Sequence, residues 1–134
     1  MNFYEGEIER IESSDDISLI RVNTAVGIFT SIVLDSPASA QYLAVGKKVT
    51  VQFKETEVIL ALPGQWIISV RNRITGIVKA ISLGKILAQV TLNCEGKDLV
   101  SLITSVAAQE MQLKEGYPVV ALIKTNEVSL TYHD

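Results

Sequence analysis

Apolar and polar residues alternate in short runs along most of this chain, and a period of two is typical of half-buried β-strands. In the second half the alternating runs cover residues 75–82, 85–92, 99–103, 119–124 and 128–131. Turn-forming residues separate them, as at Ser82-Leu83-Gly84 and Glu95-Gly96-Lys97. The pattern therefore predicts an all-β fold.

A different pattern between the third and fourth runs predicts one short helix in each half. In the second half the helix is expected over residues 105–111. In the first half Ser36 is the expected N-cap and Pro37 the first helical residue. Five strands with a small helix between the third and fourth are typical of an OB-type barrel, so we predict two tandem five-stranded OB-like barrels.

The two halves repeat each other at an offset of 70 residues without a gap. Gly6 falls on Gly76, and residues 54–60 fall on residues 124–130 with their apolar positions in phase. We predict two modules, residues 1–64 and 65–134, with the divergent module first. Each would be marginal alone, because a unit of roughly 65 residues buries only about 60% of its unfolded surface, so the modules should pack together. Trp66 is expected to anchor a core or an interface.

Composition argues against most enzyme classes. The 134 residues carry a net charge of −3 and contain one histidine, His133, and one cysteine, Cys94. No Cys/His cluster for a metal, no Ser-His pair and no phosphate loop can be assembled from them. A secretory signal and an apolar run of the roughly 20 residues that span a membrane are also missing, so we expect a cytoplasmic protein that is not an enzyme and does not contact a membrane.

Hydrogen-bond donors and positive charges gather where the strands of the second half begin or end. Before the first strand they are the Ser69 hydroxyl, the Arg71 guanidinium and the backbone N–H of Val70. The third strand is followed by Thr104 and Ser105, and the fourth by Lys124 and Thr125. A tetrahedral dianion requires several donors and one or two cations, and charge-assisted bonds to it are about twice as strong as neutral ones. These residues are therefore candidates for an oxyanion site, with plain exposed strand ends as the alternative.

At these positions the sequence resembles the Mop family, the OB-like modules that bind molybdate and tungstate. Residues 68–78 are similar to the S-A-R-N-x-L/I-x-G-x-V opening of that module, residues 102–116 to its I-T-x-x-S and L-x-L-x-E-G centre, and residues 121–128 to its A-L-I-K-A-S/T-x-V close. With the 70-residue repeat, the whole chain is similar to a di-Mop protein of the molbindin type. Ala107 departs from the pattern by replacing a serine.

The resemblance implies an intracellular protein that stores or buffers molybdate or tungstate, has no other cofactor and assembles as a homo-oligomer, with a trimer expected. It implies sites between modules and subunits, with Ser69 and Arg71 from one module and Thr104, Lys124 and Thr125 from a neighbour. Arg71 either donates to the anion or has a structural role. In the first half Leu34 and Glu55 replace Thr104 and Thr125, so at most a weak second site is expected at Lys54.

Two other functions remain open from the sequence. Modules that resemble this one occur fused to molybdate regulators and transporter ATPases, so the chain is alternatively an accessory sensing module that acts through protein partners. Single-stranded nucleic acid is the general OB ligand, but it requires a basic groove with aromatic platforms. The negative charge and the scattered aromatic residues argue against that partner.

Overall fold

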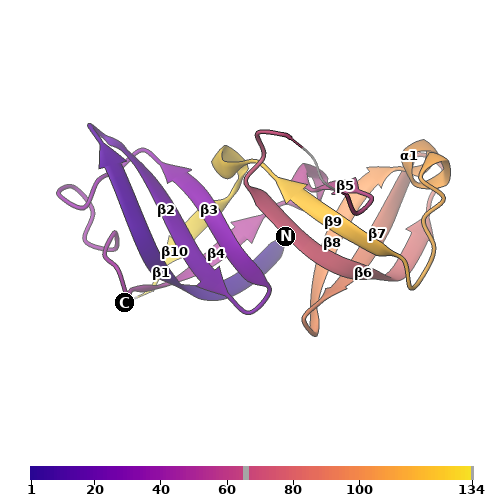
Figure 1. Ribbon diagram of the computed structural model, residues 1–134, viewed down its shortest axis with the longest axis horizontal. Coiled ribbons are helices and arrows are strands. Elements are labelled where there is room, and N and C mark those ends of the chain that lie inside the picture. The colour runs from indigo at the N-terminus through magenta and orange to yellow at the C-terminus, as the bar shows by residue number, and fades with distance from the viewer. Residues whose placement is uncertain (65–66, 134) are drawn as a thin grey trace.

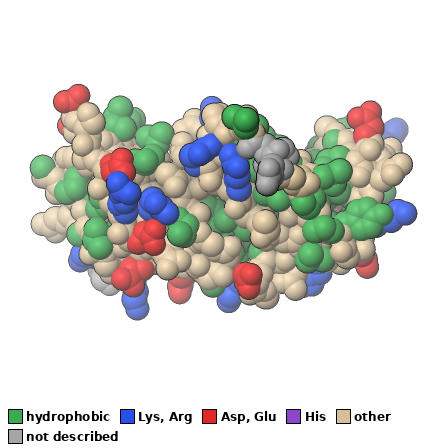
Figure 2. All heavy atoms as spheres, in the orientation of Figure 1, with side chains coloured by type: hydrophobic (Ala, Val, Ile, Leu, Met, Phe, Trp, Pro, Cys, Tyr) green, Lys and Arg blue, Asp and Glu red, His purple; other side chains and the backbone are tan. Residues whose placement is uncertain are grey.

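The protein, for which a computed structural model describes residues 1–64 and 67–133, consists of two coiled antiparallel sheets that lie side by side along the long axis (Figure 1). Together they form an elongated body (Figure 2). Trp66, the expected anchor, lies outside the described residues.

Both sheets have five strands, as the alternating pattern predicts. The first has the order β10-β4-β1-β2-β3, with β1 (Asn2–Ser14), β2 (Ile17–Thr24), β3 (Gly27–Val33), β4 (Lys48–Phe53) and β10 (Ser129–Tyr132). The second has the order β5-β9-β6-β7-β8, with β5 (Ile59–Ala61), β6 (Asn72–Leu83), β7 (Leu87–Cys94), β8 (Lys97–Thr104) and β9 (Pro118–Ile123). The expected all-β class is confirmed.

Each sheet takes one edge strand from the other half of the chain. Strand β5 belongs to the first repeat but pairs with β9, where Leu60 lies opposite Ala121. Strand β10 belongs to the second repeat but pairs with β4, where Leu130 lies opposite Val51. The division of the sequence at residues 64 and 65 remains a prediction, and neither sheet is complete without a strand from beyond that division.

Two buried asparagines at equivalent repeat positions join the halves. The Asn72 side chain accepts from the Thr30 N–H at 2.6 Å and donates to the Thr30 carbonyl at 2.9 Å. Asn2 makes the same pair of bonds with Val100, both at 2.9 Å. Because an amide supplies a donor and an acceptor side by side, it satisfies the backbone of a strand in the opposite half. The junction therefore has approximate twofold symmetry.

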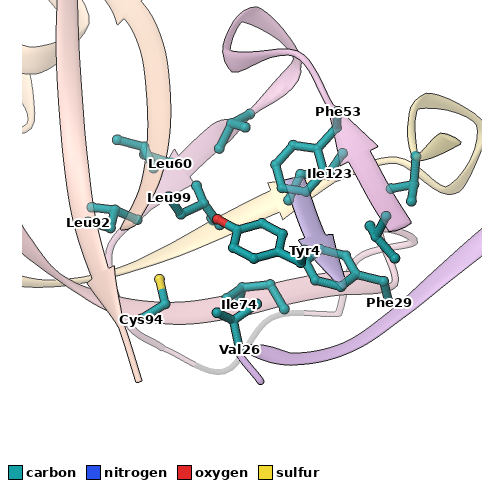
Figure 3. Close-up of a cluster of buried hydrophobic side chains, with 14 of the residues drawn as sticks. Tyr4, Val26, Phe29, Phe53, Leu60, Ile74, Leu92, Cys94, Leu99 and Ile123 are labelled. Carbon is teal, nitrogen blue, oxygen red and sulfur yellow. The ribbon is translucent and has the colours of Figure 1, made fainter. Parts of the chain in front are cut away.

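The hydrophobic core is continuous across the junction. Tyr4 stacks on Phe29, with ring centroids 5.8 Å apart, and also contacts Phe53. Figure 3 shows these rings in one cluster with side chains of the second half, including Ile74 and Ile123. The Tyr4 hydroxyl crosses the junction and donates to the Asp98 carbonyl at 2.7 Å. The two halves thus share their core, and burying it stabilises both together.

Only the second half forms the short helix that the sequence predicts for both. Helix α1 (Ser105–Glu110) begins after Thr104, whose hydroxyl accepts the Ala107 N–H at 3.1 Å. In the first half residues 37–39 form a turn, so the helix expected at Ser36 is wrong. The equivalent positions are Leu34, which has no acceptor, and Pro37, which has no N–H, so both partners of the cap are lost.

Candidate oxyanion-binding site

The pairing of β6 with β9 brings two of the predicted cationic residues to the same end of the second sheet. Asn72 lies opposite Ile123, so Arg71 and Lys124 are the next residues outward on neighbouring strands. Lys124 is the N-cap of the 3₁₀ turn η2 (Thr125–Glu127), and both Lys124 and Arg71 are exposed. This cationic end, defined as residues 68–71 with Lys124 and Thr125, holds five of the predicted site residues: Ser69, Val70, Arg71, Lys124 and Thr125.

The guanidinium of Arg71 folds back over the residues that precede it. Its Nε donates to the Ser69 carbonyl at 3.0 Å and its Nη2 to the Ile68 carbonyl at 2.5 Å. These contacts agree with a structural role for Arg71, one of the two roles that the sequence allows; the other is direct donation to the anion. One terminal nitrogen of Arg71 has no hydrogen bond within residues 1–64 and 67–133, so it can still donate to a ligand.

Arg73 also holds this segment, although the sequence pattern does not single it out. Its Nε donates to the Val70 carbonyl at 3.0 Å and its Nη2 to the Ile68 carbonyl at 3.1 Å. Two guanidinium groups therefore converge on one carbonyl oxygen. No spacing in the sequence indicates this, because Arg73 occupies an unspecified position of the family motif.

The structure does not bring Thr104 and Ser105 to the cationic end of the same chain. Thr104 lies opposite Leu87, beyond the far end of β6. The twelve residues of β6 separate the two groups by roughly 40 Å along the strand, at about 3.3 Å per residue. Thr104 therefore lies at the opposite end of the sheet from Lys124 and Thr125, with which the family resemblance groups it, and these two lie with Arg71 instead.

The two hydroxyl groups at that far end differ in what they can offer. The Thr104 hydroxyl accepts the Ala107 N–H, so its own proton remains free to donate to a ligand. The Ser105 hydroxyl is buried and donates to the Gly84 carbonyl at 2.8 Å. Thr104 is consequently the better candidate donor of the two.

The first half contains a carboxylate where the second half contains a hydroxyl. Lys54 follows β4 as Lys124 follows β9, and it is exposed. Glu55 forms an ion pair with the Met1 ammonium at 2.5 Å, and this hydrogen bond lowers the pKa of the Glu55 carboxyl. Leu34, in place of Thr104, is 79% exposed and offers no donor. A dianion at Lys54 would meet a charge of its own sign.

Two equivalent carboxyl groups meet where the halves join. Glu57 lies in the 3₁₀ turn η1 (Glu55–Glu57) and accepts the Lys54 N–H at 2.9 Å. The pKa of Glu127 is raised by burial first and by the neighbouring Glu57 carboxyl second, while Lys124 opposes the rise. The cationic end is therefore bordered by a carboxyl group, that of Glu127, whose pKa is raised.

Charge is unevenly distributed over the surface. Lys and Arg side chains gather at the upper middle of the face shown in Figure 2. A groove of about 760 Å³ on the first sheet has three carboxylates in its lining, Glu5, Glu7 and Glu9, beside the cationic Lys48 and mostly uncharged residues. This excess of negative charge disfavours an anion. Within residues 1–64 and 67–133 no three His, Cys, Asp or Glu side chains could together hold a metal ion, and no helix is long and apolar enough to cross a membrane.

Comparisons with known proteins agree with these features. Residues 68–130 match the TOBE domain family. Molybdenum-pterin-binding protein 3 of Clostridium pasteurianum is 36% identical over 64 residues, which are 47% of this chain and 94% of that protein. Molybdenum-pterin-binding protein MopA of Rhodobacter capsulatus is 35% identical over 107 residues, which are 75% of this chain. The chain spans 39% of the length of MopA and less than half of two further curated relatives.

The whole architecture also matches a solved structure. A crystal structure of the cytoplasmic molybdate-binding protein ModG with molybdate bound superposes with a TM-score of 0.91 at 29% sequence identity. The match covers 98% of this chain and 96% of the other. The similarity to ModG therefore extends over both sheets of this chain and is not limited to one half.

Proposed function

Since this chain belongs to the TOBE/Mop family of molybdate-binding modules, we propose that it binds molybdate or tungstate and serves storage or homeostasis of the anion, without chemistry of its own. The observation that carries the proposal is the cationic end, where Arg71 and Lys124 flank the paired ends of β6 and β9 beside hydroxyl and N–H donors. In keeping with the cytoplasmic ModG, we propose a cytoplasmic location.

The proposed ligand set is divided between copies of the chain. Ser69, Val70, Arg71, Lys124 and Thr125 form one part, and Thr104, with Ser105 beside it, forms the other at the far end of the sheet. Because one chain holds these parts at opposite ends, a second copy has to bring its Thr104 to the cationic end. We therefore propose a homo-oligomer, with a trimer as the family expectation.

Exposed apolar side chains beside Thr104 support this arrangement. Leu83, Ile86, Leu87 and Val106 are between 47% and 72% exposed, and they surround the far end of β6 and the start of α1. A contiguous apolar patch on a small protein commonly marks an interaction surface. Contact with another copy would bury the patch and exclude water from the anion.

The first half is proposed to contribute packing more than binding. Lys54 is at most a weak second site, since Glu55 lies next to it and is already paired with the Met1 ammonium. Repulsion between the Glu55 carboxylate and a dianion opposes binding there.

Calorimetric titration with molybdate tests the function. The wild-type chain should give saturable binding, and Lys124→Ala and Arg71→Ala should each weaken it by more than about 1.5 kcal/mol, the low end for hydrogen bonds to charged groups. Lys54→Ala and Lys79→Ala, which remove the same charge elsewhere, should change it little. The proposal would be refuted if the wild-type chain gave no heat of binding and no thermal stabilisation with either molybdate or tungstate.

A further inference from the structure

The segment before β6 is held by side chains rather than by a sheet. Residues 67–71 lie outside any strand, and Ile67 and Ser69 are exposed. Three successive carbonyl groups in this segment nevertheless have guanidinium donors. The Ile68 carbonyl accepts hydrogen bonds from both Arg71 and Arg73. The Ser69 carbonyl accepts one from Arg71, and the Val70 carbonyl accepts one from Arg73. The two arginines thus fix a stretch of backbone that would otherwise be free to turn.

Fixing these carbonyls also fixes the amide donors. In a planar trans peptide unit the C=O of one residue and the N–H of the next point in opposite directions. The bonds to the Ile68, Ser69 and Val70 carbonyls therefore set the directions of the N–H groups of Ser69, Val70 and Arg71. All three residues belong to the cationic end and are expected donors to the oxyanion, Val70 through its backbone N–H.

We infer that Arg73 is a positioning residue for this site: its guanidinium bridges the Ile68 and Val70 carbonyls and so presents the donors of residues 69–71 in the geometry that the anion requires. The inference rests on the proposed function and adds a residue to it. Arg73 is well suited because it is half-buried and its neighbour Asn72 is anchored across the junction to Thr30. A planar guanidinium with several donors in fixed directions can bridge two carbonyls, whereas an ammonium group is a point donor on a flexible stem.

The contrast with the first half supports the same conclusion. Phe3 occupies the position equivalent to Arg73, and Met1 the position equivalent to Arg71. That half has a phenyl ring in place of the Arg73 guanidinium and has Glu55 in place of Thr125. The arginine bridge and the hydroxyl at position 125 are present in the same half and absent from the other, as expected if they serve one site.

The test compares Arg73→Lys, Arg73→Gln and the control Lys79→Gln in the full chain, titrated with molybdate at fixed ionic strength. Lys79 lies on the same strand, is exposed and pairs with Asp98 at 3.0 Å, so the control removes an equal charge from β6 away from the site. Both Arg73 variants should bind about tenfold more weakly, the loss expected when one charge-assisted donor no longer reaches the anion. The control should stay within about twofold, as screened surface charges contribute little.

Arg73→Lys separates positioning from simple attraction. It keeps the positive charge but cannot bridge both carbonyls, so its affinity should fall while the salt dependence of binding stays that of the wild type. Its midpoint of thermal unfolding should match that of Lys79→Gln, which excludes a general loss of structure. Wild-type affinity in Arg73→Lys, or in both Arg73 variants, would overturn the inference and leave the proposed function intact. A wild-type chain that binds neither molybdate nor tungstate would overturn both.

Discussion

The two halves of this protein share one scaffold but differ at almost every position proposed to touch an anion. Asn2 and Asn72 make the same bonds across the junction, and Ser31 and Ser101 both donate to a carbonyl of the opposite half. These pairs show that the repeat preserves the residues that join the halves.

The differences among the proposed site residues lie at the ends of the strands. Thr104, Arg71 and Thr125 in the second half correspond to Leu34, Met1 and Glu55 in the first. Removing donors and adding a carboxylate changes what the surface attracts, yet the sheet beneath it stays the same. The comparison teaches that packing requires both halves to be alike, whereas the proposed binding requires only one half to carry the donors.

The largest expected effect is a loss of stability that is equal in both halves. Asn72→Ala and Asn2→Ala should each lower the free energy of unfolding by about 2–6 kcal/mol, because each leaves a backbone N–H and C=O at the junction without partners, at about 1–3 kcal/mol for each buried group. Urea unfolding followed by fluorescence and circular dichroism measures this. Asn126→Ala, on an exposed residue, is the control.

The shared core also predicts how these variants unfold. Both should still unfold in a single transition, because the two sheets exchange strands and bury one cluster of side chains. A variant that unfolds in two separate steps, or one asparagine that proves dispensable, would show that the halves are not equivalent parts of one unit.

Much of this scaffold can be predicted from the sequence, and the strand exchange is the main exception. The alternation of apolar and polar residues predicts the strands, and the 70-residue offset indicates the repeat. The exchange is not predictable in this way because residues 58–60 and 128–130 have similar patterns, Val-Ile-Leu and Val-Ser-Leu. Either segment satisfies either sheet edge, and only the path of the connecting chain decides between them.

The candidate site was predictable in its residue types but not in its arrangement. Motif order indicated Arg71, Thr104 and Lys124, yet only the pairing of β6 with β9 shows that Arg71 and Lys124 share one end and Thr104 the other. The contacts of Arg73 depend on the local turn of residues 68–70, for which the sequence has no signal. The missing helix of the first half was in principle predictable, since Pro37 cannot donate to a cap.

A smaller effect is expected from the cap that distinguishes the two halves. Thr104→Val keeps the shape of the side chain but removes the acceptor for the Ala107 N–H, and this should cost about 1 kcal/mol of stability. Leu34→Thr should bring no comparable gain, because Pro37 leaves no N–H to cap. Thermal unfolding of both variants measures the difference. Equal and opposite changes in the two variants would contradict this explanation of the single helix.

The smallest effect concerns the carboxyl pair between the halves. The raised pKa of Glu127 means that its proton stabilises the fold at pH values below the ordinary carboxyl range, and that this contribution is lost as pH rises through the raised pKa. Glu127→Gln should therefore stabilise the protein at pH 7, by less than about 1 kcal/mol since the group is partly solvated, and should bring no gain at pH 3.5. Urea titrations at the two pH values, with Glu115→Gln as an exposed control, measure it. A gain that is the same at both pH values would mean that it does not arise from the titration of Glu127, and would contradict the raised pKa.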